Sequence, residues 1–471
     1  MEHSKGKRFV IIGSGPTALG AAYRLHELIQ NGELPSSTQV TVLEKEIEVG
    51  GLARSVTDRR GFTWDLGVHV TGYSKYPKFT HLLNRTVRHW NNVPRCVKAY
   101  MRHVIQDDDN VEANYVPYPV QDSIPYFPEE VKLRCLDEIS SPAAPSKKAE
   151  NFDDFTANTF GETLQAIFIR PYNEKVWTVT LDEMNCVWVE NRVPRTNIED
   201  LTRRCRLARD ELDQEDSAKT KSVFRYPRDC RGIGDVWKAI ASELPSHWFH
   251  FPSQRIPLEK HCKQSSSDRT MKRSSLLESE CAVLNQNSQN NFPGFTFLSL
   301  ILFFIGLYPF FTISRKVQLR LKRSFGKNLQ LSDKIVLYSR CTFMSNFNER
   351  LTPNAVLFWS VLVEIGMSSD EDVHEDTVID CTIKDLIEHG IIYPTSRIES
   401  TWLHVLPYGY PIPTLNRDRE LQKAHESLEA ANIYSRGRFG SWRYEAANQD
   451  HSFTMGSDVV DRIVYGTEET L

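Results

Sequence analysis

The segment that begins at Arg8 constrains the fold more than any other part of the chain. An apolar run, RFVII, leads directly into GSGPTALG, which fits the pattern G-x-G-x-x-G/A. We expect a strand over residues 8–12, a tight glycine turn and a helix over residues 18–28. Such a turn lets the backbone approach a pyrophosphate at the helix N-terminus. The candidate contacts at this turn are Gly13, Gly15, Pro16, Thr17 and Ala18.

A second apolar run, residues 39–43, ends in Glu44, whose carboxylate can accept hydrogen bonds from both hydroxyls of a ribose. The gap between motif and acid exceeds the usual ~20 residues, and the polar loop 31–38 accounts for the excess. The sequence VGGLA follows, with Gly51 and Leu52 as further candidate contacts. This order is typical of FAD enzymes of the glutathione-reductase and amine-oxidase type. NAD(P) alone, a decayed nucleotide site and glycines that only make turns are the alternatives.

Charge and cysteine content exclude several classes of protein. The chain has 471 residues and a net charge of −4, which gives no reason to expect a nucleic acid partner. Nine cysteines are dispersed without a C-x-x-C pair, so we expect reduced thiols and no metal site. The N-terminus has no apolar signal segment, and we expect a cytoplasmic protein of two or three domains.

Cations and aromatic rings are concentrated in residues 433–452, IYSRGRFGSWRYEAANQDHS. Arginines can bind phosphate, and aromatic faces can cover sugars or flat rings. The segment closely resembles the C-terminal signature of eukaryotic UDP-galactopyranose mutases, which are FAD enzymes. The resemblance places Arg438 beside FAD and the substrate phosphates, and Tyr444 on the sugar diphosphate. It also implies that Asn448 is an active-site amide and that Gln449 and Ser452 lie near the flavin.

The segment GFTWDLGVHV, residues 61–70, resembles a mobile loop of the mutases whose histidine lies against the flavin. The resemblance gives that place to His69 and makes Gly67 a cofactor contact. Family members usually carry Gly-Gly before this histidine, whereas this chain has Gly67-Val68. A Cβ at a position that needs φ > 0 would restrict the loop. A histidine satisfied within the core is the alternative.

Two middle segments resemble the substrate pocket of the mutases. YVPYPVQ, residues 115–121, matches V-P-Y-P-x-Q, and the block 167–194 holds IFIRPYNEKVWTV and WVENRVP. A proline-rich packing loop and a helix–helix layer with a surface ion pair are the alternatives. By resemblance, the candidate contacts to uridine and sugar are Gln121, Phe168, Asn173 and Trp177, with Arg192 on the diphosphate.

Later segments supply the rest of the implied site. YSRCTFMSNF, residues 338–347, and PYGYPIPTL, residues 407–415, resemble the mutase runs that hold a second diphosphate arginine and a substrate tyrosine. Arg340 and Tyr410 take these places. Two departures weaken the likeness: no tyrosine stands near Gln330, and side chains interrupt the glycine-rich return at residues 224–237.

The resemblance is lost over residues 262–331. Residues 292–313, FPGFTFLSLILFFIGLYPFFTI, carry no charge and are followed by a basic stretch, which makes them a transmembrane candidate. A membrane span there would put the two halves of one FAD site on opposite sides of a bilayer, so we expect no membrane partner. A flawed gene model, a divergent insert and a true anchor remain open.

The implied fold is α/β: an FAD-binding Rossmann-type domain with an inserted helical domain and a smaller sheet domain. Residues 1–90 form the first part of the FAD domain, and residues 91–221 form the substrate-side segments and helical domain. Residues 222–262 return to the FAD domain, and 263–331 are the doubtful insert. Residues 332–425 form the sheet domain, and 426–471 complete the FAD site.

The implied reaction interconverts UDP-galactopyranose and UDP-galactofuranose, which serves cell wall biosynthesis. In the family, N5 of reduced FAD attacks the anomeric carbon, and NADPH reduces FAD beforehand. His69, Arg192 and Arg340 would be the catalytic residues. A catalytically impaired relative or flawed gene model and an FAD-dependent amine oxidase remain the alternatives. The sequence leaves a homo-oligomer open.

Overall fold

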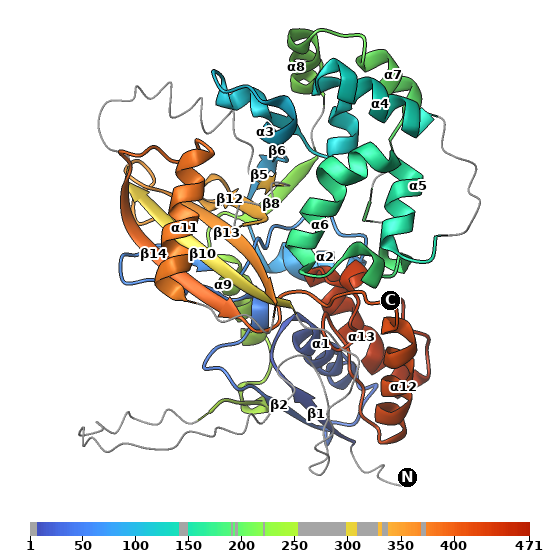
Figure 1. Cartoon of the computed structure of the whole chain (residues 1–471). Helices are drawn as coiled ribbons and strands as arrows, with labels where there is room; N and C mark the ends of the chain where they lie inside the picture. The colour runs from blue at the N-terminus through green and yellow to red at the C-terminus, as the bar shows by residue number, and fades with distance from the viewer. Residues whose placement is uncertain are drawn as a thin grey trace, which may run out of the picture.

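The computed structural model describes residues 7–140, 149–189, 192–193, 196–219, 222–252, 298–308, 328–331, 338–368 and 374–471. The predicted insert, residues 263–331, therefore lies outside the described residues apart from 298–308 and 328–331. Three parts are visible in Figure 1: a nucleotide-binding layer that holds the N-terminus, a group of helices above it, and a large sheet beside both.

The nucleotide-binding layer is a parallel sheet of order β1-β2-β9, with α1 packed on it. The predicted strands 8–12 and 39–43 are confirmed as β1 and β2, and the predicted helix 18–28 lies within α1. Val42 and Leu28 are fully buried between these elements because alternate strand residues and one helix face are apolar. The bounds are β1 Arg8–Ile12, α1 Pro16–Gln30, β2 Gln39–Leu43, α9 Ile233–Ser242 and β9 Phe249–His250.

The C-terminal helix α13, Gln449–Tyr465, packs directly against α1. A Cβ added at Gly20 would lie 2.1 Å from the carbonyl oxygen of Phe453, and one at Gly456 would lie 1.9 Å from that of Thr17. Only glycine allows the two backbones to approach this closely. Arg24 pairs with Asp461 further along both helices, so they run in the same direction. Their N-termini therefore lie on the same side of the molecule.

The largest sheet has seven strands in the order β14-β10-β13-β12-β11-β6-β7. It is mostly antiparallel, and its one parallel pair is β11 with β6. The helix α11, Glu375–Glu388, packs on this sheet, as Figure 1 shows. The bounds are β6 Val97–Tyr100, β7 Tyr115–Pro117, β10 Leu298–Tyr308, β11 Asn328–Leu331, β12 Arg340–Phe343, β13 Trp359–Ser368 and β14 Arg397–Leu406.

Half of the uncharged run at residues 292–313 belongs to this sheet. Residues 298–308 form β10, which is hydrogen-bonded to β13 on one side and β14 on the other. A continuous apolar run suits a strand with neighbours on both edges as well as it suits a buried helix. No helix in the described part of the chain is long and apolar enough to cross a membrane.

The helical part surrounds its own buried cluster, which includes Trp177, Trp188 and Leu164. A π-helical turn, Gln165–Ile169, joins α5 to α6. Two small two-stranded sheets, β3–β4 and β5–β8, contact α9, and residues of both sheets share a buried cluster with Leu362 and Leu406 of the large sheet. The bounds are β3 Ser55–Thr57, β4 Thr63–Asp65, α2 Pro77–Thr86, β5 Trp90–Pro94, α3 Arg102–Ile105, α4 Glu129–Ser140, α5 Phe152–Leu164, α6 Arg170–Trp177, α7 Ile198–Arg204, α8 Arg209–Ala218, β8 Val223–Pro227 and α12 Arg417–Ala430.

Candidate functional site

The turn between β1 and α1 is shaped for a phosphate group. Gly13 has φ 92°, and Gly15 is the N-cap of α1 without a side-chain cap, so the first N–H groups of the helix keep their capacity to donate. The hydroxyl of Thr17 is buried and has no hydrogen-bond partner among the residues that the structure describes. Pro16 and Ala18 are also buried here. A cradle of backbone donors with an unsatisfied hydroxyl fits a pyrophosphate.

Glu44 directly follows β2 and is held beside this turn. Its Oε2 accepts a hydrogen bond from the Ser14 hydroxyl at 2.5 Å, and its Oε1 accepts one from the backbone N–H of Glu46 at 2.8 Å. A Cβ on Gly51 would lie 3.0 Å from the Cα of Gly15. The two glycine segments therefore touch, and Leu52 beside them packs against a neighbouring buried cluster.

A buried carboxylate organises the next wall of the site. Asp65, at the end of β4, accepts hydrogen bonds from the hydroxyls of Ser55 and Tyr226, each at 2.5 Å, and from the backbone N–H of Ile233 at 3.1 Å. Burial raises the pKa of this carboxyl to about 6, although the three donors act in the opposite direction. Asp65 thus joins β4, β8 and the start of α9.

The glycine-rich return, which side chains interrupt in the sequence, packs closely against Ser55. A Cβ on Gly232, where φ is 138°, would lie 2.4 Å from the Ser55 hydroxyl, and one on Gly234 would lie 2.5 Å from the Ser55 nitrogen. The interrupting Asp235 accepts a hydrogen bond from the backbone N–H of Arg231 at 2.9 Å. The added side chains therefore stabilise the loop without filling the approach.

The loop after β4 brings His69 against Gly67. A Cβ on Gly67, where φ is 122°, would lie 3.3 Å from Cε1 of the His69 ring. Val68 is not among the residues with positive φ and packs against a buried cluster, so the predicted restriction at Val68 is wrong. Burial, followed by the charges of Arg438 and Arg340, lowers the pKa of His69 to about 3. The imidazole is therefore neutral near pH 7, and its buried Nδ1 has no hydrogen-bond partner in the described part of the chain.

The C-terminal segment reaches the site from the opposite end of the chain. Arg438 donates to the carbonyl of Ala447 at 3.0 Å and lies over the ring of Tyr410 at 5.5 Å. Asn448 is the exposed N-cap of α13 and makes no side-chain cap bond. Gln449 accepts a hydrogen bond from the Trp237 indole at 2.6 Å. Ser452 is buried in the first turns of α13, so this second helix start lies beside that of α1.

Five aromatic rings from three segments form the wall on the helical side. The ring of Trp177 lies edge-on to Tyr444 at 4.7 Å, and Tyr410 lies edge-on to Tyr444 at 5.5 Å. The Trp177 indole donates to Asn173 at 3.3 Å. Phe168 stacks on Tyr172 at 5.2 Å in the π-helical turn, a local geometry that is common at functional sites. The structure therefore brings these predicted substrate residues together.

Both predicted diphosphate arginines contact this aromatic cluster. Arg192 donates to the backbone carbonyls of Tyr444 and Glu445 at 3.1 and 2.9 Å, and its guanidinium lies over the Tyr444 ring at 5.2 Å. Arg340 donates to the Tyr410 hydroxyl at 3.4 Å and forms a close ion pair with Glu364. Burial opposes the charge of Arg340, but Glu364 beside it raises the pKa of the guanidinium above its usual value.

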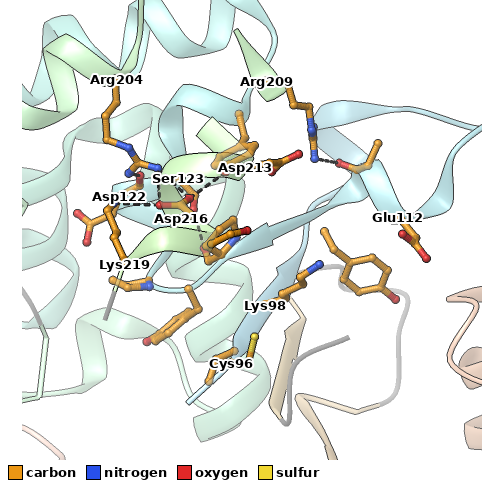
Figure 2. Close-up of a pocket in the computed structure, with 18 of the residues that line it drawn as sticks. Cys96, Lys98, Glu112, Asp122, Ser123, Arg204, Arg209, Asp213, Asp216 and Lys219 are labelled. Carbon is orange, nitrogen blue, oxygen red and sulfur yellow. Dashed lines mark hydrogen bonds and ion pairs between the residues drawn. The ribbon is translucent and has the colours of Figure 1, made fainter. Parts of the chain in front are cut away.

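A cavity of about 1250 Å³ opens behind this wall, between β6, β7 and the helical part (Figure 2). Arg192 and Tyr118 line it, so it begins where the predicted substrate site ends. Gln121, which is buried, lies in the turn after Tyr118. In Figure 2 the labelled Arg204 reaches Asp216. The side chain of Lys98 extends from β6 between this pair and Glu112. The cavity is lined by residues of both charges, such as Arg204 and Asp216, and Arg192 belongs both to its lining and to the aromatic cluster.

Sequence reasoning missed Asp65, Tyr172 and Glu364. Glu364 lies within the apolar strand β13, and only the register of that strand shows that Glu364 stands opposite Arg340. A single carboxylate in an otherwise apolar strand is the signal that could have found it, because a buried charge needs a partner. Only the stacking of its ring on Phe168 identifies Tyr172 as a candidate.

Comparisons with known proteins support the fold. Residues 11–86 match the model of an NAD(P)-binding Rossmann-like domain. A solved structure of reduced UDP-galactopyranose mutase matches with a TM-score of 0.79 and 28% identity, over 99% of this chain and 96% of that one.

More distant structures share the fold alone. A putative protoporphyrinogen oxidase from Exiguobacterium sp. 255-15 matches with a TM-score of 0.62 at 13% identity, over 98% of this chain and 99% of that one. A putrescine oxidase matches with a TM-score of 0.51 at 10% identity, over the same shares of the two chains. The predicted fold class is confirmed, and the chain resembles UDP-galactopyranose mutase in structure along almost its whole length.

Proposed function

We propose that this protein is a UDP-galactopyranose mutase that interconverts UDP-galactopyranose and UDP-galactofuranose. The observation that carries the proposal is the convergence of Arg192, Arg340 and Arg438 on one aromatic cluster beside a dinucleotide cradle. A nucleotide-sugar diphosphate needs several cations together with flat apolar surfaces for its base and sugar. The solved mutase that this chain resembles supports the same substrate class.

The residues of the nucleotide-binding layer fit FAD. The start of α1 offers backbone donors and the unpartnered hydroxyl of Thr17 to a pyrophosphate, and Glu44 stands where a ribose would lie. The start of α13 offers a second set of donors near Gln449 and Ser452. His69 has an unpartnered buried nitrogen that can face a flat ring. Reduced FAD bound here would supply the N5 nucleophile for the anomeric carbon.

The protein itself would bind and orient the substrate and neutralise the charge of its diphosphate. Arg192 and Arg340 would hold the diphosphate as it leaves the sugar and returns, so the two reacting centres stay within reach. Trp177, Tyr410 and Tyr444 would cover the sugar and exclude water from it. Because the pKa of His69 is about 3, its imidazole adds no third charge beside the flavin position at neutral pH.

NADPH is the reductant that we propose, because the family resemblance implies it. Arg102 lies upstream of the segment 115–121, where the same family resemblance implies an arginine near the nicotinamide nucleotide; it is exposed on α3 and paired with Asp108 at 2.8 Å. Its ion pair would have to open for that contact. Reduction of the bound flavin by NADPH under anaerobic conditions, followed at the flavin absorbance band, tests this step.

The proposal is tested by incubating FAD-loaded protein with dithionite and UDP-galactofuranose without air. Chromatography should show conversion to UDP-galactopyranose by the reduced protein and none by the oxidised protein. A parallel incubation of oxidised protein with putrescine in air should give no peroxide. Peroxide without any change of the sugar ring would instead identify an amine oxidase. FAD binding with neither activity would identify a catalytically impaired relative.

A further inference from the structure

Arg340 and Glu364 are opposite each other on neighbouring strands of the large sheet. β12 and β13 are antiparallel, and the register pairs Arg340 with Glu364. Residues directly opposite in such a pair place their side chains on the same face. Glu364 is buried with 4% of its surface exposed, and its strand is otherwise apolar around it. The carboxylate is therefore part of the inner wall of the proposed diphosphate site.

The ion pair occupies only part of the guanidinium. Nε and Nη2 of Arg340 both contact the same carboxylate oxygen of Glu364, and Nη2 also reaches the Tyr410 hydroxyl. Nη1 has no hydrogen-bond partner within the described part of the chain. Arginine presents its five donors in a rigid fork, so fixing one edge also fixes the direction of the other. Glu364 thus leaves one end of Arg340 to a ligand.

The surrounding charges make Glu364 important for affinity. Arg340 and Arg438 are close enough to lower the pKa of His69, which leaves the imidazole neutral. Glu445, whose backbone carbonyl accepts a hydrogen bond from Arg192, has its carboxylate bound by Arg417 through two bonds of 3.0 Å. Glu364 is the carboxylate that pairs with Arg340 in the described part of the chain. Removing it would leave more positive potential for an anionic ligand.

We propose that Glu364 is a resident counterion of Arg340 that limits the affinity of the site for a nucleoside diphosphate. The inference rests on the proposed function, because it assumes that the diphosphate of the substrate binds at Arg340. A ligand phosphate must share Arg340 with a carboxylate that is already in place, and this sharing weakens the bound state. The counterion thereby favours release of the product and keeps Arg340 oriented when the site has no ligand.

The test compares binding of UDP and of uridine to the FAD-loaded wild type and to Glu364→Gln. Glutamine keeps the shape and one acceptor but removes the charge. We expect UDP to bind roughly tenfold more tightly to the variant, since one unit charge at this range is worth at least that factor. The affinity for uridine, which has no phosphate, should stay unchanged. Added salt should reduce the UDP affinity of the variant more steeply than that of the wild type.

Two further variants separate charge from structure. Glu399→Gln removes a glutamate of the same sheet that pairs with Arg60 and Arg397 at 3.3 Å, and it should leave UDP affinity unchanged. Glu364→Asp keeps the charge and should bind UDP within about twofold of the wild type.

The outcomes distinguish the inference from the function on which it rests. The counterion role would be overturned if a folded Glu364→Gln variant bound UDP no more tightly than the wild type. It would also be overturned if Glu364→Asp, which keeps the charge, gained as much UDP affinity as Glu364→Gln. A wild type that binds UDP no more tightly than uridine would overturn the diphosphate site itself, and the counterion with it.

Discussion

The two halves of the candidate site are built in different ways. The nucleotide cradle consists of backbone: Gly13 and Gly15 at the start of α1, and Gly51 in contact with them. The diphosphate region consists of side chains: Arg192, Arg340 and the rings around them come from widely separated segments. The nucleotide cradle depends on glycines, which have no side chain, whereas the diphosphate region depends on balanced charge.

This difference determines what a substitution does. An added methyl group in the cradle meets backbone that cannot move, so the expected damage is to folding and FAD binding together. A lost charge in the diphosphate region leaves the backbone in place but leaves a buried partner without compensation. Steric changes should therefore break the first half, and charge changes should break or retune the second.

The largest expected effect comes from Gly456→Leu. The first carbon of the new side chain would lie 1.9 Å from the carbonyl oxygen of Thr17, so α13 must move away from α1. We expect a loss of at least about 3 kcal/mol of unfolding free energy and loss of bound FAD. Thermal unfolding and flavin absorbance measure both. Gly72→Ala is the matched control, because nothing lies within 4 Å of its added Cβ; equal damage in the control would refute the steric explanation.

Arg340→Ala should have the next largest effect. It leaves Glu364 buried without its cation, which we expect to cost about 3–5 kcal/mol of unfolding free energy. Mutase turnover should fall by about a hundredfold or more, because a donor to the diphosphate is lost. Adding Glu364→Gln should restore much of the stability but none of the activity. Stability that does not recover in the double variant would show that the pair is not the cause.

Asp65→Asn should change the pH dependence of stability. The folded-state pKa of Asp65 is raised from 3.8 to about 6, so the stability contribution of its neutral form is complete below about pH 4 and disappears as the pH rises through 6. The difference corresponds to roughly 3 kcal/mol between those limits. The variant should lack this decrease of unfolding free energy with rising pH, and unfolding curves measured from pH 4 to 7 give its slope.

A companion variant sharpens the prediction for Asp65. Tyr226→Phe removes one donor to the ionised carboxylate, so the pKa of Asp65 should rise further and the slope should move to higher pH. A slope of the same size in Asp65→Asn would assign the pH dependence to other groups.

Gly366→Ala should have the smallest effect. Its Cβ would lie 2.7 Å from the carbonyl oxygen of Lys175, next to Trp177 on α6. The helix should shift slightly from the sheet, raising KM severalfold with a stability loss of about 1 kcal/mol. Steady-state kinetics measure the effect. An unchanged KM would mean that α6 does not set the position of the substrate.

Local patterns predicted the cradle well because its geometry is encoded in consecutive residues. The strands 8–12 and 39–43 are confirmed to the residue, and the helix predicted at 18–28 lies within α1. The glycine motif needs no distant partner to be recognised. The prediction for Val68 was wrong because the positive φ belongs to Gly67 alone.

The charge-based half could be predicted only through the family resemblance. Nothing near Arg340 in the sequence indicates Glu364, because their pairing depends on the register of two strands. The apolar run 292–313 left several interpretations open, since a buried strand and a membrane helix share one composition. Its residues 298–308 lie between β13 and β14, which periodicity alone could not show.

One measurement tests most directly whether both halves serve a single reaction. Reduced FAD-loaded wild type and Arg340→Lys would be incubated anaerobically with UDP-galactofuranose, and UDP-galactopyranose would be quantified by chromatography. The account predicts conversion by the wild type and at least a hundredfold slower conversion by the variant, with equal FAD content in both. No conversion by a wild type that holds reduced FAD and binds UDP would contradict it.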